Sequence, residues 1–152
     1  MVAMNTITAA RTVSISIHRS ADEVYAFIAD VENFPLWSAF AKTVKKEGSD
    51  WIFETPQGAR RVRFAVKNKF RVLDHYVSVS PTQTVYAPMR VVANGAEACG
   101  VIFTVLRQPR MADEQFTADV ALVVADLQSL KRELEREPAT VEQTEEEHVS
   151  HG

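Results

Sequence analysis

The sequence is poor in cysteine and has no long apolar run, and each shortage excludes a class of protein. Cys99 is the only cysteine, so no internal disulfide can form, and four scattered histidines do not complete a zinc module. No stretch reaches the roughly 20 apolar residues of a membrane span, and residues 1–10 lack the pattern of a signal peptide. We therefore predict a cytoplasmic protein with no membrane span, no metal and no cofactor.

Motifs that would carry common chemistries are also missing. The sequence has no glycine-rich phosphate loop, no G-x-S-x-G and no H-E-x-x-H, so nucleotide, hydrolase and zinc-protease functions have no support. A formal net charge of −3 does not favour a nucleic-acid partner either. The sequence leaves a homodimer open.

The composition is that of one globular domain. The chain has 152 residues, of which 46% are hydrophobic and 24% are charged, which is enough for a core with room for a cavity. Acidic residues prevail after Ala112. We predict an N-terminal extension over residues 1–11, a ligand-binding domain over residues 12–136, and a disordered acidic tail over residues 137–152.

Two kinds of periodicity follow one another near the N-terminus. Residues 12–18 alternate apolar and polar side chains, which predicts a strand with one buried face. Ser20 and Glu23 then form an S-x-x-E capping box ahead of apolar residues at helical spacing, which predicts a short helix. Pro35 suits the first turn of a second short helix.

Short apolar-polar alternations fill the stretch from Ala41 to Leu106, as antiparallel strands require. Turn residues divide it at five places, which are residues 48–50, 56–58, 69–71, 81–83 and 94–95. We therefore predict six strands in this stretch and seven in total.

The pattern returns to a helical one after Pro109. One apolar stripe runs through Phe116, Val120, Val123, Val124, Leu127, Leu130 and Leu134. It predicts a helix from Asp113, the expected N-cap, to Glu135, about 34 Å long at 1.5 Å per residue. Only the sheet can cover such a stripe in this α+β chain, so we expect the sheet to curve around the helix.

A D-x-x-N-x-P-x-W spacing follows the capped helix and is formed by Asp30, Asn33, Pro35 and Trp37. Together with the later run Leu73-Asp74-His75-Tyr76-Val77, it resembles the START-like (SRPBCC) superfamily, in its polyketide cyclase/dehydrase-like branch. The resemblance covers about residues 12–136.

This resemblance implies a helix-grip fold, in which a seven-stranded antiparallel curved sheet wraps around a long C-terminal helix and two short helices follow strand 1. It also implies an apolar cavity between the sheet and the helix, because members of the superfamily bind lipids, polyketides and other apolar molecules.

Alternation indicates which side chains face the inside of such a sheet, because residues two apart share a face of a strand. We take the apolar face as the inner one. The inner residues are then Trp51, Phe53, Val62, Phe64, Val66, Leu73, His75, Val77, Val85, Met89, Val91, Val101, Phe103 and Val105. The outer ones include Glu54, Arg61, Arg63, Tyr86 and Arg90.

Large or adaptable apolar side chains suit contact with a flat or greasy ligand, and ordinary core packing accounts for them equally well. The expected ligand-binding residues are Trp51, Phe53, Phe64, His75, Met89, Phe103, Phe116, Val120 and Trp37. Phe34 and Trp37 have two interpretations, as part of the cavity mouth or as a plug that holds the short helices to the sheet.

His75 is the one titratable group that alternation places among apolar neighbours. An imidazole can move a proton at a carbonyl-bearing substrate near pH 7, so His75 is the candidate catalytic residue. The alternative is a core histidine held by a backbone carbonyl. Asp74 points to the opposite face, where we expect an ion pair, and it is not placed to orient His75.

The remaining polar groups are expected to be structural. The basic run from Arg60 to Arg71 suits a solvated outer sheet face, with docking of an acidic partner as the alternative. Cys99 suits a structural thiol, and His148 and His151 lack the further ligands that a metal needs.

Three functions are consistent with these observations. The leading one is the binding of a small hydrophobic or aromatic molecule between the sheet and the C-terminal helix. The second is cyclisation, dehydration or aromatisation of a poly-β-ketone with His75 as acid/base, as the family resemblance implies. The third is a non-catalytic module that binds a partner protein.

Overall fold

A computed structural model describes residues 9–136. The expected tail and its two histidines lie outside the described residues. The elements follow in the order β1 (Ala10–Ile17), α1 (Ala21–Ala29), η2 (Val31–Leu36), β2 (Thr43–Glu47), β3 (Asp50–Thr55), β4 (Gly58–Phe64), β5 (His75–Ser80), β6 (Gln83–Ala87), β7 (Met89–Ala93), β8 (Cys99–Leu106) and α2 (Asp113–Glu135).

The capping box begins the first helix as predicted. The Ser20 hydroxyl oxygen accepts a hydrogen bond from the backbone N–H of Glu23 at 3.1 Å, which satisfies one of the free donors at the start of α1. The second short helix, η2, is a 3-10 helix that begins at Val31. Pro35 therefore lies inside it and not in its first turn, which corrects the prediction.

All five predicted breaks separate strands. Two of the hairpin turns depend on glycine, because Gly48 and Gly95 have φ angles of 63° and 81°, in the left-handed region that other residues enter at a cost. Every strand pair is antiparallel, as the alternation predicted.

The strand count and the continuity of the sheet differ from the prediction. The strands form two sheets, ordered β1-β8-β7 and β2-β3-β4-β5-β6. The difference arises at Pro88, which divides one expected strand into β6 and β7 because proline has no N–H to donate to a ladder. At the next residue, the backbone N–H of Met89 donates to Oδ1 of Asp74 at 2.9 Å. An isolated bridge between Val72 and Arg90 joins the two sheets.

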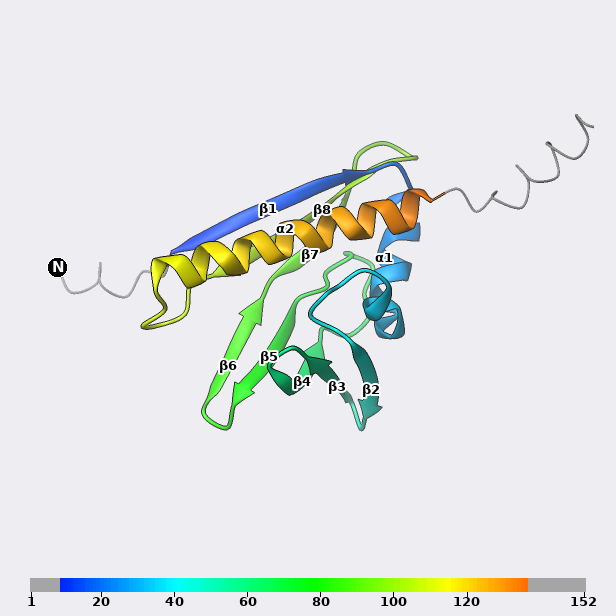
Figure 1. The fold of residues 1–152 in the computed structure, drawn as a ribbon. Coiled ribbons are helices and arrows are strands. Elements are labelled where there is room, and N and C mark those ends of the chain that lie inside the picture. The colour runs from blue at the N-terminus through cyan, green and yellow to red at the C-terminus, as the bar shows by residue number, and fades with distance from the viewer. Residues whose placement is uncertain (1–8, 137–152) are drawn as a thin grey trace, which may run out of the picture.

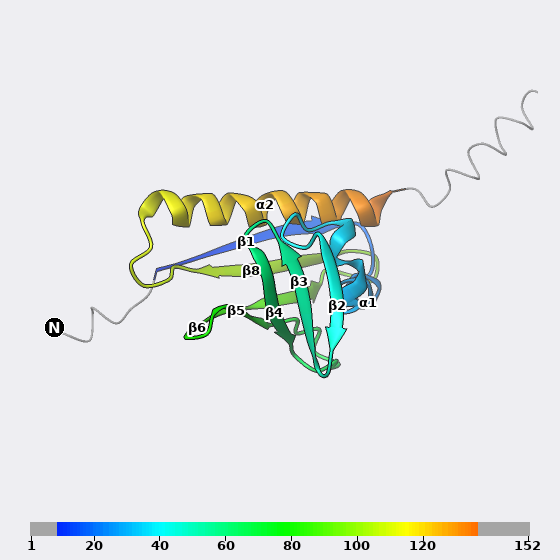
Figure 2. The same cartoon turned by 60° about the horizontal axis from the view of Figure 1, so that its bottom comes forward.

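The long helix spans the predicted residues and packs on the first sheet. Figures 1 and 2 show α2 running alongside β1 and β8, while β2–β6 turn away from these strands. Val120, Leu127 and Leu130 of the predicted stripe are buried. Asp113 is not the N-cap: Ala112 occupies that position in an extended conformation, and Asp113 pairs with Arg107 at 2.5 Å.

The predicted inner residues are buried or partly buried with one exception. Val66 is 87% exposed. The alternation fails there because β4 ends at Phe64, after which the chain leaves the sheet. The largest fully buried side chains are Phe53, Ile17, Ile28, Met89 and Leu130, and they come from both sheets, α1 and α2.

Candidate functional site

The inner face of the sheet is closed at one end and open at the other. On β8, Cys99 and Val101 are buried, whereas Phe103 and Val105 remain partly exposed. The same gradient runs along β1, β5 and β6, whose partly exposed inner side chains are Val13, Val79 and Val85. On α2, Phe116 is partly exposed near the helix start, and burial varies along the rest of the stripe. Apolar surface is therefore accessible from the end that carries the β5–β6 turn and the start of α2.

A hollow of about 560 Å³ lies at this open end. It is lined by the β5–β6 turn and the segment between β8 and α2, through Thr82, Gln83, Thr84, Gln108, Pro109 and Arg110. None of the expected ligand-binding residues lines it. The hollow lies at the surface between these two segments, and its lining residues are mostly polar.

Phe34 of η2 is the centre of an aromatic cluster at the closed end. Its ring centroid lies 4.7 Å from Trp37, 5.5 Å from Phe53 and 5.3 Å from Phe64, in tilted or edge-on geometry. Edge-on ring pairs stabilise a core beyond the area that they bury. The cluster holds η2 to β3 and β4, which fits the interpretation of Phe34 and Trp37 as a plug.

Trp37 brings an unusual group into this cluster. Its indole Nε1 is buried and has no hydrogen-bond partner among residues 9–136. An unpaired buried donor costs about 1–3 kcal/mol, so most such groups find an acceptor. The Trp37 N–H is therefore an unsatisfied buried donor within the described residues.

His75 continues the row of rings toward the open end. Its ring centroid lies 4.9 Å from Phe64 and 5.8 Å from Phe103, and the side chain is 7% exposed. Nδ1 lies 3.0 Å from the carbonyl oxygen of Leu73. Because a carbonyl only accepts, Nδ1 carries the proton, and Nε2 has no partner within the described part of the chain.

The environment of His75 keeps it neutral. Burial lowers its pKa below the usual value, and the hydrogen bond to Leu73 and the charge of Asp74 oppose this only in part. Neutral imidazole with the proton on Nδ1 has an unprotonated Nε2, which is a proton acceptor. The geometry is therefore consistent with both interpretations of His75, a core histidine held by the Leu73 carbonyl and a catalytic base.

Asp74 lies on the outer face, as predicted, but it forms no ion pair with any of residues 9–136. Its carboxylate accepts hydrogen bonds from the Tyr86 hydroxyl at 2.7 Å and from the backbone N–H of Met89 at 2.9 Å. The expected ion pair was wrong because the break at Pro88 brings a backbone donor to this carboxylate. The hydrogen bond that Asp74 accepts from the Tyr86 hydroxyl also raises the pKa of Tyr86.

Asp126 joins α2 to the segment after η2. Its carboxylate accepts hydrogen bonds from the Ser38 hydroxyl at 2.8 Å and from the backbone N–H of Ala39 at 3.0 Å. Burial raises its pKa, and these two hydrogen bonds lower it by less. These two hydrogen bonds, which we call the Asp126 clasp, attach residues 38–39 to α2 beside the aromatic cluster.

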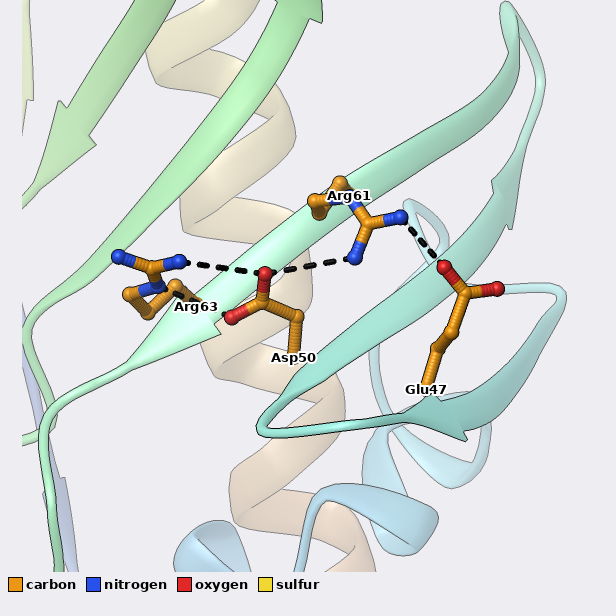
Figure 3. A network of polar contacts seen from close by, with 4 residues as sticks. All are labelled: Glu47, Asp50, Arg61 and Arg63. Atoms are coloured by element: carbon orange, nitrogen blue, oxygen red, sulfur yellow. Dashed lines mark hydrogen bonds and ion pairs between the residues drawn. The ribbon is translucent and has the colours of Figure 1, made fainter.

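The outer face of β3 and β4 carries a network of ion pairs (Figure 3). Asp50 accepts from Arg63 Nε at 2.9 Å and from Arg61 Nη1 at 3.3 Å, and Arg61 also pairs with Glu47. The hydrogen bond from Arg63 is the main cause that lowers the pKa of Asp50. Part of the basic run is thus a paired outer face, whereas Lys67, Lys69 and Arg71 lie beyond β4 and not on the sheet.

The other expected ligand-binding residues occupy different places. Trp51 is near the start of β3, and the Lys46 ammonium lies 5.1 Å from the centroid of its ring. Met89 is only 1% exposed. Phe116 is at the open end with the Arg107 guanidinium 6.0 Å from its ring, and Val120 is buried on α2. The structure thus brings Trp37, Phe53, Phe64, His75 and Phe103 into one row and leaves these four around it.

Some residues of the site were not in the expected set. Val85 and Val105 belong to the accessible apolar surface at the open end, and Val123 is partly exposed near the middle of α2. Alternation and helical spacing had already placed them on inner faces, so that signal could have included them. For Asp126, whose partner is 88 residues away, no sequence signal exists.

None of the helices within residues 9–136 combines the length and the apolar composition that crossing a bilayer requires. In the same residues, no three His, Cys, Asp or Glu side chains gather as a metal site would need. Cys99 is buried, and burial raises its thiol pKa, as a structural thiol requires.

Comparison with known proteins identifies the fold. No protein-family profile and no curated protein matches the sequence. Among solved structures, the Zhui aromatase/cyclase of a Streptomyces species has a TM-score of 0.67 at 17% identity, over 86% of this chain and 95% of that one. A truncated norcoclaurine synthase from Thalictrum flavum has a TM-score of 0.63 at 11% identity, over 86% and 95% of the two chains.

A START superfamily protein from Mycobacterium smegmatis gives a TM-score of 0.63 at 10% identity, over 82% of this chain and 98% of that one. At these identities a likeness establishes the fold, and the activity must be argued from the site. The chain therefore shares the fold of these three proteins, a START-like fold as the motif around Trp37 indicated.

Proposed function

We propose that this protein binds a small hydrophobic or aromatic molecule between the inner face of the sheet and α2, entering from the open end. The observation that carries the proposal is the burial gradient along the strands. Phe103 and Val105 of β8 and Phe116 near the start of α2 are partly exposed, whereas Cys99 and Val101 at the other end of β8 are buried. Partly exposed apolar side chains on a concave face are typical of a ligand site.

The aromatic row favours a flat ligand over a flexible chain. Phe64, His75 and Phe103 present ring edges and faces to one another at 4.9 Å and 5.8 Å, and an aromatic guest can extend such packing. The solved structures of similar fold include a norcoclaurine synthase and an aromatase/cyclase, and the second name refers to formation of an aromatic product. These names support the proposal by analogy of fold.

Titration with an apolar fluorophore, anilinonaphthalene sulfonate, tests the proposal. We expect saturable binding by the wild type and a loss of at least about tenfold in affinity for Val105→Trp, which fills the open end. Val92→Trp is the matched control, because Val92 is exposed on β7 and its neighbour Val91 is buried. Absence of saturable binding to the wild type, or equal effects of the two variants, would contradict the proposal.

A second candidate function, proton transfer in the cyclisation of a poly-β-ketone, is favoured by the state of His75. A neutral imidazole whose Nε2 has no partner in the described residues can accept a proton from the acidic carbon between two carbonyls. The apolar walls would hold the ketone chain in a reactive conformer.

The variant His75→Phe separates this candidate from binding alone. Phenylalanine keeps the ring packing against Phe64 and Phe103, so fluorophore affinity should stay near that of the wild type. Turnover of a linear triketone should fall by about 10²–10⁴-fold if His75 is the base. Unchanged turnover would remove His75 from the mechanism.

A further inference from the structure

The segment between β4 and β5 carries the two most exposed large apolar side chains in the described part of the molecule. Val66 is 87% exposed and Phe70 is 71% exposed. The two lysines between them, Lys67 and Lys69, are exposed as well. Along residues 66–70, which we call the 66–70 loop, the side chains alternate apolar, basic, polar, basic and apolar.

Asn68 holds this loop in one conformation. Its side-chain Nδ2 donates to the carbonyl oxygens of Val66 at 2.9 Å and Val72 at 3.0 Å, and its Oδ1 accepts from the backbone N–H groups of Phe70 at 3.0 Å and Val72 at 3.1 Å. The backbone N–H of Asn68 donates to the Tyr25 hydroxyl of α1 at 3.0 Å. The exposure of Val66 and Phe70 is thus built into a braced loop, so little further ordering is needed on binding.

The charged side chains beside Val66 and Phe70 are two lysines without an acidic partner in the described part of the chain. The next basic residue, Arg71, is neutralised, since its Nε lies 2.8 Å from Oδ1 of Asp22. Within residues 9–136, Lys67 and Lys69 have no acidic partner, and the Lys69 ammonium lies 5.6 Å from the centroid of the Phe70 ring. Two cations therefore stand between two apolar side chains at the surface.

We propose that the 66–70 loop docks on an anionic lipid bilayer surface. Phe70 and Val66 enter the boundary between headgroups and acyl chains, and Lys67 and Lys69 contact lipid phosphates and carboxylates. Exposed apolar side chains contribute by burial, and each lysine near an anionic leaflet adds to the attraction. This inference concerns a surface away from the open end and does not depend on ligand binding there.

The shape of the feature favours a bilayer over a protein partner. Specific protein interfaces bury about 1,200–2,000 Å², which calls for a broad complementary surface. The 66–70 loop offers only two protruding apolar side chains, and these suit a fluid surface that adapts around each of them. The net charge of −3 opposes approach to an anionic surface, so docking is local and weak in high salt.

Sedimentation of the full chain with lipid vesicles tests the proposal. We expect binding to phosphatidylcholine vesicles that contain about 30% phosphatidylserine, and much weaker binding to phosphatidylcholine alone. The variants Lys67→Ala and Lys69→Ala should each weaken binding about fivefold, and Phe70→Ala about tenfold. Raising the salt from about 0.1 M to 1 M should release the protein.

Matched controls come from other exposed residues. Leu122→Ala removes an apolar side chain that is 58% exposed on α2, and Lys45→Ala removes an exposed lysine on β2. Both should bind vesicles like the wild type. All of these positions are exposed, and circular dichroism checks that each variant is folded.

A direct reading of insertion comes from Phe70→Trp. Its emission should shift to the blue on anionic vesicles, and brominated acyl chains should quench it, whereas Leu122→Trp should show neither change. The proposal is overturned if the wild type does not bind anionic vesicles, or if the loop variants bind as well as the controls. It is also overturned if a photo-crosslinker at position 70 attaches to a protein and never to lipid.

Fluorophore titration of the same loop variants keeps the two proposals apart. Phe70→Ala should bind anilinonaphthalene sulfonate like the wild type, because residue 70 is outside the row of rings. Loss of vesicle binding with intact fluorophore binding supports docking by the 66–70 loop as a separate property.

Discussion

The carboxylate of Asp126 lies 2.8 Å from the hydroxyl of Ser38, which is 88 residues away in the sequence. Asp126 also accepts from the backbone N–H of Ala39, so two donors beside the aromatic cluster depend on one side chain of α2. The position of η2 against the sheet is thus tied to the long helix as well as to the ring packing of Phe34.

Asp126→Ala should lower the free energy of unfolding by about 2 kcal/mol. The substitution removes the acceptor of the Ser38 hydroxyl in a partly buried place, and that of the exposed Ala39 N–H. Urea denaturation measures the change. Gln128→Ala, at an exposed position of the same helix, serves as the control and should leave the free energy nearly unchanged. Equal values for the two variants would show that the clasp contributes nothing.

His75 should make stability depend on pH. Burial lowers the pKa of His75 in the folded protein, so the unfolded chain binds more protons on this side chain as the pH falls below about 6.5. The free energy of unfolding should therefore decrease between about pH 7.5 and pH 5.5 in the wild type, and decrease less in His75→Phe. Parallel urea curves at both pH values measure this difference, and an identical pH dependence of both proteins would contradict it.

Asp50 should stabilise the outer face of β3 and β4 only while it is ionised. Arg63 and Arg61 lower its pKa, so its contribution is present above the unfolded value near 3.9 and disappears as the pH falls through the lower folded pKa. We expect Asp50→Asn to lower the thermal midpoint at pH 7 and to leave it almost unchanged in strong acid. Added salt should shrink the difference at pH 7, since both arginines are solvent-exposed.

Phe53→Ala should cost about 3–5 kcal/mol of unfolding free energy. Phe53 is 1% exposed, and its ring lies 5.5 Å from Phe34 and 5.8 Å from Phe40. The neighbouring Ile52 points to the outer face, so Ile52→Ala is the matched control and should cost about 1 kcal/mol. Thermal and urea denaturation of the two variants measure the difference. Equal losses of unfolding free energy would show that the aromatic cluster contributes no more than the outer face.

Local signals predicted the elements well because each depends on neighbours in the sequence. The Ser20 capping box, the glycine turns and the apolar stripe of α2 specify backbone conformation within a few residues. The range of the long helix was therefore predicted correctly, although its N-cap is Ala112 and not Asp113. The break at Pro88 was also visible in the sequence, and its meaning was missed because the alternation of Val85 and Met89 continues through it.

The site was harder to predict because its contacts join distant segments. Phe34 meets Phe53 and Phe64 only after η2 has docked on the second sheet. Alternation gave the correct face for Phe53 and Phe64, and it failed at Val66 because it assumed that β4 continues. Neither the hydrogen bonds of Asp74 nor the lone indole N–H of Trp37 follows from any spacing of residues.

Cys99 pairs with Ile17 on one side and with Ala93 on the other, so the only thiol of the chain sits in the middle strand of the first sheet. Its side chain is 1% exposed, and burial raises its pKa, so the native protein offers almost no thiolate to a reagent. Alkylation must wait until β8 separates from its neighbours. The rate of thiol labelling in native buffer therefore reports how often this sheet opens, without any engineered probe.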